Sequence, residues 1–173
     1  EDLRRMLLEL AALTDKLTVE WTPPSDGPER PCVRVFRADG SDTGIAFHGV
    51  PGGHEFNSFI VGLYNAAGPG QSIDPALAEA IAAIGKPLEL QIVVSLTCTM
   101  CPELVMAAQK IAASNPLVTA KAYDVNLFPE LRERYKIMSV PCLIINKTKA
   151  AFGKKTLAQL LELLAEPEAG HAG

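Results

Sequence analysis

The residues best suited to chemistry are two cysteines separated by two residues, in the run Cys98-Thr99-Met100-Cys101. Exchange between a dithiol and a disulfide needs a thiolate, a second thiol within bonding distance, and access for a partner. The N–H groups and the dipole at a helix N-terminus favour a thiolate there. We therefore expect Cys98 to attack a partner disulfide and Cys101 to resolve the mixed disulfide, which leaves a redox-active Cys98–Cys101 disulfide.

Apolar patterning places this motif between a strand and a helix. Residues 88–94 are apolar and rich in β-branched side chains, which predicts a strand ending just before the motif. Helical spacing then predicts a helix behind Cys101. Further on we expect strands over 118–125, 141–146 and 150–152, and helices over 129–136 and 156–165. This βαβαββα order predicts an α/β fold with a central mixed sheet and helices on both faces.

The first half of the chain repeats the end of this order. We expect a helix over 2–15, strands over 17–21, 32–36 and 44–48, and a helix over 53–66. Pro31-Cys32 and Pro141-Cys142 each open a hairpin that leads into a helix, which indicates an internal duplication. We therefore expect two fused folds, the first lacking its opening strand. The predicted parts are a redox-inactive half (1–70), a linking helix (71–86), a redox-active half (87–166) and a disordered tail (167–173).

Metal binding is an alternative use of the same cysteine spacing. A structural zinc site needs a second ligand pair, whereas Cys32 and Cys142 stand alone in apolar strands and the three histidines are scattered. The run Leu96-Thr97-Cys98 also resembles the motif of heavy-metal-binding domains, but the helices expected over 129–136 and 156–165 do not fit that fold. We expect no metal site and interpret Cys32 and Cys142 as structural thiols.

A proline 40 residues after the motif favours disulfide exchange. Val140-Pro141 resembles the cis-proline segment of the thioredoxin superfamily, which packs against the CxxC and leaves backbone groups free to pair with an incoming peptide. The resemblance implies that Val140-Pro141 is cis. It also implies that Val140 and Pro141 form the docking surface for the partner, together with three residues of the motif loop: Thr97, Thr99 and Met100.

Two longer segments carry a closer resemblance. Residues 95–116, from Ser95-Leu96-Thr97-Cys98 to Ser114-Asn115-Pro116, and the run Gly53-His54-Glu55-Phe56 are similar to the N-terminal domain of the F component of alkyl hydroperoxide reductase. The resemblance covers nearly the whole chain. It implies two fused thioredoxin-like folds, of which only the second is redox-active. It also implies that the CxxC takes electrons from a flavoprotein disulfide reductase and passes them to a peroxiredoxin-type protein in peroxide detoxification.

The sequence departs from the full-length family after residue 166, where no dinucleotide-binding glycine fingerprint follows. We therefore expect no cofactor bound to this chain, with FAD and NAD(P)H only in a partner module. The chain is then either one domain of a longer protein or a stand-alone carrier. Two other functions stay open: a general protein disulfide oxidoreductase, and a non-enzymatic CxxC metal-binding or adaptor module.

A buried acid is the remaining catalytic candidate. Thioredoxins place a carboxylate on the strand before the motif, where it moves the proton of the resolving cysteine. The matching residue here is Ile92, which cannot do so. The family resemblance points instead to Glu55 from the first fold. Glu103 could interact with the helix N-terminus, and both acids could equally be solvated surface residues.

The composition of the chain argues against some classes of binding partner. The chain has 173 residues, a formal net charge of −4, and no basic block, which argues against nucleic acid and anionic membrane surfaces as partners. No apolar run approaches the roughly 20 residues that a membrane-spanning helix needs. The start of the chain has no signal-peptide pattern, so we expect a cytoplasmic protein.

Overall fold

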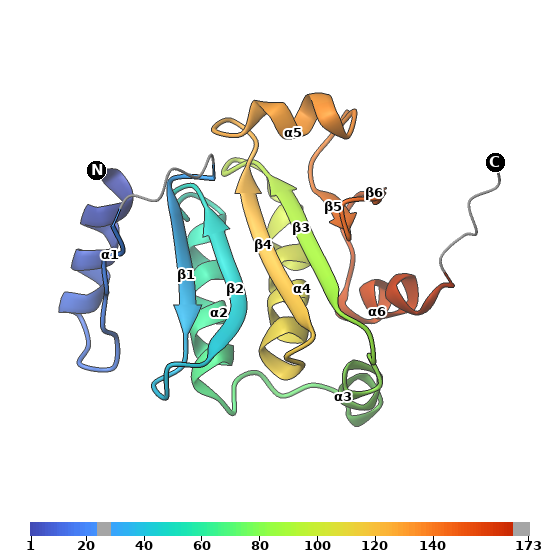
Figure 1. Cartoon of the computed structure of the whole chain (residues 1–173), viewed down its shortest axis with the longest axis horizontal. Helices are drawn as coiled ribbons and strands as arrows, with labels where there is room; N and C mark the ends of the chain where they lie inside the picture. The colour runs from blue at the N-terminus through green and yellow to red at the C-terminus, as the bar shows by residue number, and fades with distance from the viewer. Residues whose placement is uncertain (24–28, 168–173) are drawn as a thin grey trace.

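A single mixed sheet organises the chain in the computed structural model, which describes residues 1–23 and 29–167. The strands lie in the order β1-β2-β4-β3-β5-β6. Their bounds are β1 Cys32–Phe36, β2 Asp42–His48, β3 Leu88–Val94, β4 Val118–Asp124, β5 Cys142–Ile145 and β6 Lys149–Phe152. The helices are α1 Asp2–Ala12, α2 Glu55–Ala67, α3 Pro75–Ala82, α4 Cys101–Ser114, α5 Pro129–Arg134 and α6 Leu157–Ala165 (Figure 1).

The second half has the predicted βαβαββα order. Strand β3 pairs parallel with β4 and antiparallel with β5, and β5 pairs antiparallel with β6. Ile92, in the middle of β3, is in register with Ala122 on one side and Leu143 on the other. This apolar row crosses three strands, so it gives α4 a continuous surface on which to pack.

The first half reproduces the hairpin-and-helix part of the second. Strands β1 and β2 form an antiparallel hairpin and α2 follows it, as α6 follows β5 and β6. Strand β2 also pairs parallel with β4, which joins the two halves in one sheet. The architecture is that of two fused thioredoxin-like folds, and no counterpart of β3 precedes α1 among the described residues. The predicted boundaries at residues 70 and 87 stay a prediction.

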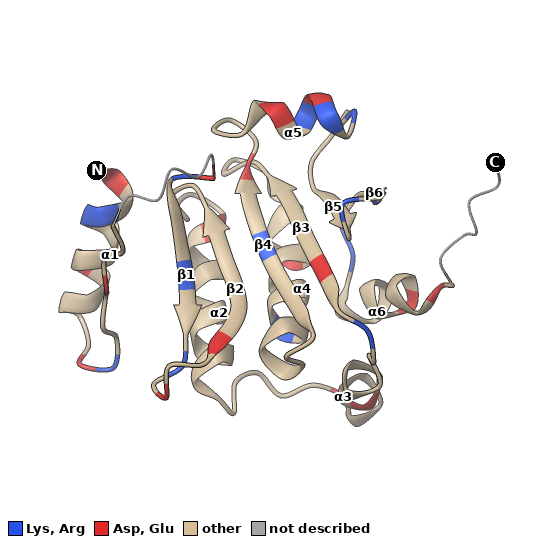
Figure 2. Cartoon of the chain, in the orientation of Figure 1, with Lys and Arg blue, Asp and Glu red and all other residues tan. Residues whose placement is uncertain are grey.

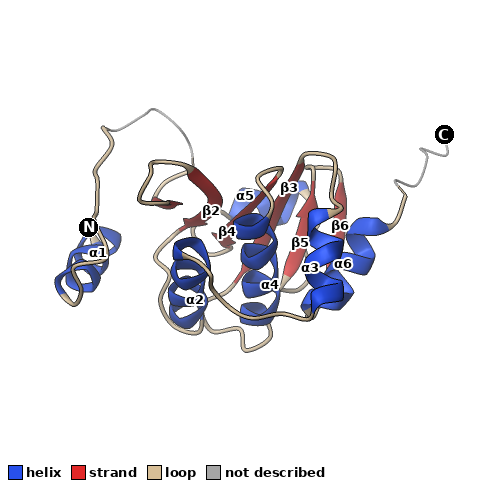
Figure 3. Cartoon of the chain, turned by 90° about the horizontal axis from the view of Figure 1, so that it is seen from below, coloured by secondary structure: helices blue, strands red, loops and turns tan. Residues whose placement is uncertain are grey.

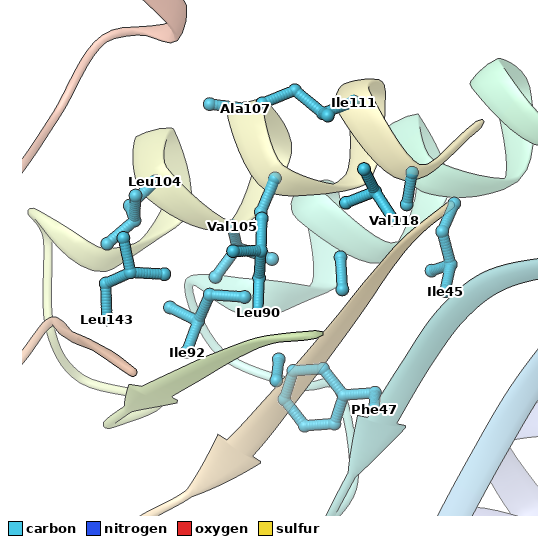
Figure 4. Packing of buried hydrophobic residues seen from close by; sticks show 14 of the residues in the cluster. Ile45, Phe47, Leu90, Ile92, Leu104, Val105, Ala107, Ile111, Val118 and Leu143 are labelled. Atoms are coloured by element: carbon cyan, nitrogen blue, oxygen red, sulfur yellow. The ribbon is translucent and has the colours of Figure 1, made fainter. Parts of the chain in front are cut away.

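Helices cover the two faces of the sheet unequally. Figure 3 shows α2, α4, α3 and α6 in one layer beneath the sheet. In Figure 4, Leu104 and Val105 of α4 point toward Leu90, Ile92 and Leu143, which are all buried. On the opposite face a smaller cluster joins α5 to the sheet; it includes Val93, Tyr123, Phe128, Leu131 and Ile144. The predicted helices on both faces are therefore present, with α5 covering only part of the second face.

Three predicted elements differ from the observed ones. Residues 17–21 were expected to form a strand but pair with no strand in the described structure. Strand β1 pairs only with β2, so residues 17–21 do not extend the sheet at its outer edge, and their strand-like composition does not by itself give them a partner. The first helix ends at Ala12 rather than at residue 15, and the linking helix expected over 71–86 is the shorter helix α3, Pro75–Ala82. Most of the predicted disordered tail, 168–173, lies outside the described residues.

Candidate active site

The CxxC lies in a tight turn between β3 and α4. The Cys98 amide donates to the carbonyl oxygen of Ser95 at 3.0 Å, which folds the chain back directly after the strand. Cys98 is half-buried, whereas Cys101 is 0% exposed and forms the first residue of α4. The helix therefore begins three residues after Cys98. Both cysteines are free thiols, so the structure describes the reduced pair.

The proline segment lies beside the outer cysteine. The peptide bond between Val140 and Pro141 is cis, as predicted. The Cys98 Sγ lies 3.9 Å from the Val140 carbonyl oxygen and can donate a weak S–H hydrogen bond to it. Val140 is half-buried and Pro141 is buried. The Val140 carbonyl thus lies next to the thiol of the half-buried Cys98.

The inner cysteine needs a proton acceptor before it can react. Burial raises the pKa of the Cys101 thiol well above its ordinary value, and the nearby Cys98 and the negative charge of Glu55 raise it further. Only a thiolate attacks a disulfide. A neighbouring base that takes the proton as Cys101 attacks would therefore speed this step.

Among the described residues of the first half, Glu55 is the acid that acts on this thiol. It is the first residue of α2 and is 0% exposed. Burial raises the pKa of its carboxyl from 4.5 to about 7. Neither carboxyl oxygen has a hydrogen-bond partner among the described residues. Ser58 lies one turn further along α2 and lowers the pKa of the Glu55 carboxyl, which offsets part of the rise caused by burial. The Ser58 hydroxyl itself makes no hydrogen bond among the described residues.

Backbone contacts hold the start of α2 against the motif loop. The His54 amide donates to the Leu96 carbonyl oxygen at 2.9 Å. Gly53 permits this approach because it has a positive φ of 53°, and a Cβ at this position would lie 2.5 Å from the same oxygen. The Gly53-His54-Glu55 run therefore positions the carboxyl by main-chain packing.

The rim of the site is exposed and partly apolar. Thr97, Thr99 and Met100 are all exposed, as expected for residues that contact a partner. Sequence reasoning missed Met138, which lies two residues before Val140 and is 91% exposed. Its spacing gave no signal, because an apolar residue just before a buried strand is usually part of the core. Two methionines, Met100 and Met138, thus flank the two chain segments that meet at Cys98.

Other candidate chemistry finds less support. Glu103, the alternative acid, is exposed in the first turn of α4. Within residues 1–23 and 29–167, no group of three or more His, Cys, Asp or Glu side chains is arranged to hold a metal ion. In the same ranges, every helix is too short or too polar to cross a membrane.

Known proteins match this chain in sequence and in fold. A family model for the thioredoxin domain matches residues 88–165. The solved structure of the NTD N/C domain of alkylhydroperoxide reductase AhpF from Enterococcus faecalis is 40% identical, with 95% of this chain and 83% of that chain covered and a TM-score of 0.90. This chain belongs to the AhpF family, the F component of alkyl hydroperoxide reductase. The family supports a thiol–disulfide oxidoreductase as the general kind of protein.

Curated relatives of this family are much longer. The F component of alkyl hydroperoxide reductase from Pseudomonas aeruginosa is 33% identical over 171 residues, which are 99% of this chain and 32% of the relative. A Bacillus subtilis protein named NADH dehydrogenase is 30% identical over 161 residues, which are 93% of this chain and 31% of that protein. The chain thus spans about one third of the length of these relatives.

Proposed function

We propose that this AhpF-family domain carries electrons between a flavoprotein disulfide reductase and a peroxiredoxin-type protein. One juxtaposition carries the proposal: a half-exposed Cys98 next to the cis-proline carbonyl, with a buried Cys101 behind it at the start of α4. This arrangement lets a protein disulfide reach one sulfur while it keeps the second sulfur for the internal step. We propose a cytoplasmic location, where thiols are kept reduced.

The reaction is two successive thiol–disulfide exchanges. The Cys98 thiolate attacks one sulfur of the partner disulfide; a Cys98–partner bond forms, and the other partner sulfur leaves as a thiolate and takes up a proton. Cys101 then attacks Cys98 Sγ, which forms the Cys98–Cys101 disulfide and releases the second partner thiol. Two electrons have moved from the domain to the partner. The flavoprotein returns them by the reverse exchange, and we propose that FAD and NAD(P)H bind in that reductase module.

Glu55 is proposed to act as the proton acceptor for Cys101. A carboxyl whose pKa is about 7 is partly ionised at neutral pH, so it can take a proton and give it back. Its position at the start of α2 puts it close enough to raise the pKa of Cys101. The proposed role explains why an acid with no hydrogen-bond partner among the described residues is buried here.

The partner is proposed to dock on the rim around Cys98. An extended peptide could pair with the backbone at Val140 while its disulfide meets Cys98, in the manner of strand addition. Met100 and Met138 would contact apolar side chains of that peptide, because exposed methionines adapt to varied surfaces. The exposed hydroxyls of Thr97 and Thr99 complete the rim.

The proposal is tested by trapping the partner. A Cys101→Ser variant cannot resolve the mixed disulfide, so the partner should stay bound to Cys98 until a reductant is added. The trapped proteins are identified by mass spectrometry from cells expressing the variant. A Cys98→Ser variant is the matched control and should trap nothing. Recovery of a peroxiredoxin-type protein and a flavoprotein disulfide reductase is the expected result.

Two other results would contradict the proposal and favour a different function. Many unrelated trapped proteins would favour a general protein disulfide oxidoreductase. A bound metal that protects both thiols of the wild-type protein from a thiol reagent would favour a metal-binding or adaptor module, and elemental analysis of the purified protein measures it directly.

A further inference from the structure

A second thiol, Cys32, lies beside a histidine in the half of the molecule that has no CxxC. Cys32 opens β1 and is in register with His48 at the end of β2. The Cys32 Sγ lies 3.7 Å from His48 Nε2. Cys32 is half-buried, whereas the side chain of Cys142, at the matching place in the second half, is fully buried. The two strand-opening cysteines are therefore not equivalent in burial or in contacts.

The hydrogen bonds of His48 leave Nε2 available as a proton acceptor. Nδ1 lies 2.8 Å from the carbonyl oxygen of Glu29, and because a carbonyl only accepts, Nδ1 has to carry the proton. In the neutral ring Nε2 then carries a lone pair, which faces the Cys32 thiol. Burial lowers the pKa of His48, which is 4% exposed, so the ring is neutral at physiological pH.

Aromatic packing fixes the histidine ring in this orientation. The rings of His48 and Tyr123 stack with centroids 4.2 Å apart, and Phe128 meets His48 edge-on. The Tyr123 hydroxyl donates to the Glu29 carboxylate at 3.3 Å. A buried base held by three neighbours and aimed at a half-exposed thiol is the arrangement that activates cysteine nucleophiles.

A small depression with basic residues lies next to this pair on the same face of the sheet. Directly paired residues share a face, so Cys32, His48 and Tyr123 form one row across three strands. Two positions along the strands, Arg34, Ala46 and Lys121 form the next row, about 7 Å away. Figure 2 shows the basic positions on β1 and β4, with β2 between them.

The depression has a volume of about 160 Å³ and is lined by residues that include Arg34, Ala46, Thr119 and Lys121. Arg34 is ion-paired with Asp42, whereas Lys121 makes no salt bridge within the described part of the chain. Lys121 and Arg34 both favour a negative charge on Cys32. The volume of the depression suits one arm of a small molecule. The positive charge of Lys121 favours an arm that is anionic.

We propose that Cys32 is a modification site that forms a mixed disulfide with a small anionic disulfide, with His48 as the base and Lys121 as the cation that holds the carboxylate arm. His48 Nε2 takes the thiol proton as Cys32 Sγ attacks one sulfur of the disulfide RS–SR. A Cys32–SR bond forms, the S–S bond of the reagent breaks, and RS⁻ leaves and takes the proton from His48. Cys32 is oxidised and one half of the reagent is reduced. This site is independent of the proposed electron transfer.

Burial makes this base necessary. It raises the pKa of the Cys32 thiol, and Glu29 raises it further, so Arg34 and Lys121 alone do not ionise the thiol. Without His48, Cys32 should behave as an ordinary buried thiol.

The experiment uses the full chain with Cys98 and Cys101 changed to Ser. The CxxC can then neither react with the probe disulfide nor reduce the mixed disulfide on Cys32. Glutathione disulfide is the anionic probe and cystamine the cationic one; intact mass and peptide mapping follow the adduct with time. We expect one glutathionyl group on Cys32 and none on Cys142, at a rate at least tenfold above that with cystamine. His48→Phe keeps the aromatic packing and should slow the reaction about tenfold or more.

Two further variants make the result decisive. Cys32→Ser should abolish the adduct. Lys121→Gln, a change on a half-buried surface position, should lower the ratio of the glutathione disulfide rate to the cystamine rate several-fold, so it decides the question even if His48→Phe fails to fold. The proposal is overturned if Cys32 stays unmodified, if both probes react at the same rate, or if a folded His48→Phe variant reacts as fast as its parent.

Discussion

The helices α2 and α6 occupy equivalent places in the two halves of the molecule, and they begin differently. Each follows an antiparallel hairpin. Helix α6 begins with a complete capping box, in which Thr156 accepts from the Gln159 amide and the Gln159 side chain accepts from the Thr156 amide. Helix α2 has no side-chain cap, and its first residue is the buried Glu55. The start of α6 stabilises the fold, whereas the start of α2 places an acid next to the Cys101 thiol.

The difference indicates how one fold can divide its tasks between two copies. A capping box satisfies two orphan N–H groups and stabilises a helix by about 1 kcal/mol. A buried carboxyl without partners does the opposite, because its charged form is poorly solvated. Helix α2 is held by its contact with the motif loop, through the His54 amide and the Leu96 carbonyl, so its start can carry a group that α6 could not.

The largest expected effect is on stability as a function of pH. The folded protein keeps the Glu55 proton up to about pH 7, whereas an unfolded chain releases it near pH 4.5. The folded state therefore binds more protons in this window, so the free energy of unfolding falls as pH rises, by roughly 3 kcal/mol for this group. In Glu55→Gln this loss should be absent. Urea unfolding between pH 4 and 8.5 measures the free energy of unfolding of the wild type and of Glu55→Gln. Subtracting one from the other cancels the contributions of other titrating groups, such as His48, that both proteins share. A constant difference over that range would show that Glu55 is not a strained acid.

The next effect is on the rate of the internal exchange step. A chromogenic aromatic disulfide releases coloured thiolate twice, first when Cys98 attacks and again when Cys101 resolves the mixed disulfide. Glu55→Gln should slow the second release about 10- to 100-fold at pH 7 and leave the first nearly unchanged, because only Cys101 needs the base. In the wild type the second rate should rise through pH 7 as Glu55 ionises. Stopped-flow absorbance separates the two phases, and an unchanged second phase would remove Glu55 from the mechanism.

The fold was predictable from the sequence where the local pattern of residue types agreed with the strand pairing. The bounds of β1 and β3 match the predicted strands because both are short segments rich in β-branched and apolar side chains. Residues 17–21 have the composition of a strand, yet a strand also needs a neighbour, and composition does not report whether one is present. The join between β2 and β4, which fuses the two halves, has no local signature at all.

The site was predictable in its sulfurs and its proline, and less so around them. Cys98 and Cys101 follow from spacing and element order, and the cis bond at Pro141 followed from the resemblance to the thioredoxin superfamily. The burial of Glu55 does not, since an acid after Gly53-His54 has the appearance of an exposed first-turn residue, and only the family resemblance pointed to it. Met138 was missed because an apolar residue just before a buried strand is usually part of the core. The contact of His48 with Cys32 was missed because it joins two different strands.

A smaller effect should follow from moving the start of α2. In Gly53→Ala the added methyl would meet the Leu96 carbonyl oxygen at 2.5 Å, and alanine disfavours a φ of 53°. We expect a loss of about 2 kcal/mol in stability and a several-fold slower second release, because Glu55 shifts with the helix. Gly68→Ala is the matched control: it also has a positive φ, of 59°, but its Cβ would meet no atom within 4 Å. It should lose stability without slowing the second release, and an equal slowing in both variants would argue against positioning by Gly53.

The smallest effect separates the two helix starts most cleanly. Thr156→Ala removes the side-chain acceptor of the α6 capping box and should cost about 1 kcal/mol of stability. Both release phases of the chromogenic assay should stay at wild-type rates, because α6 brings no titratable group to Cys98 or Cys101. Urea unfolding and stopped-flow measurements on the same sample test both expectations. If Thr156→Ala slowed the second release as much as Glu55→Gln does, then loss of rigidity at a helix start would account for both variants and the acid would need no chemical role.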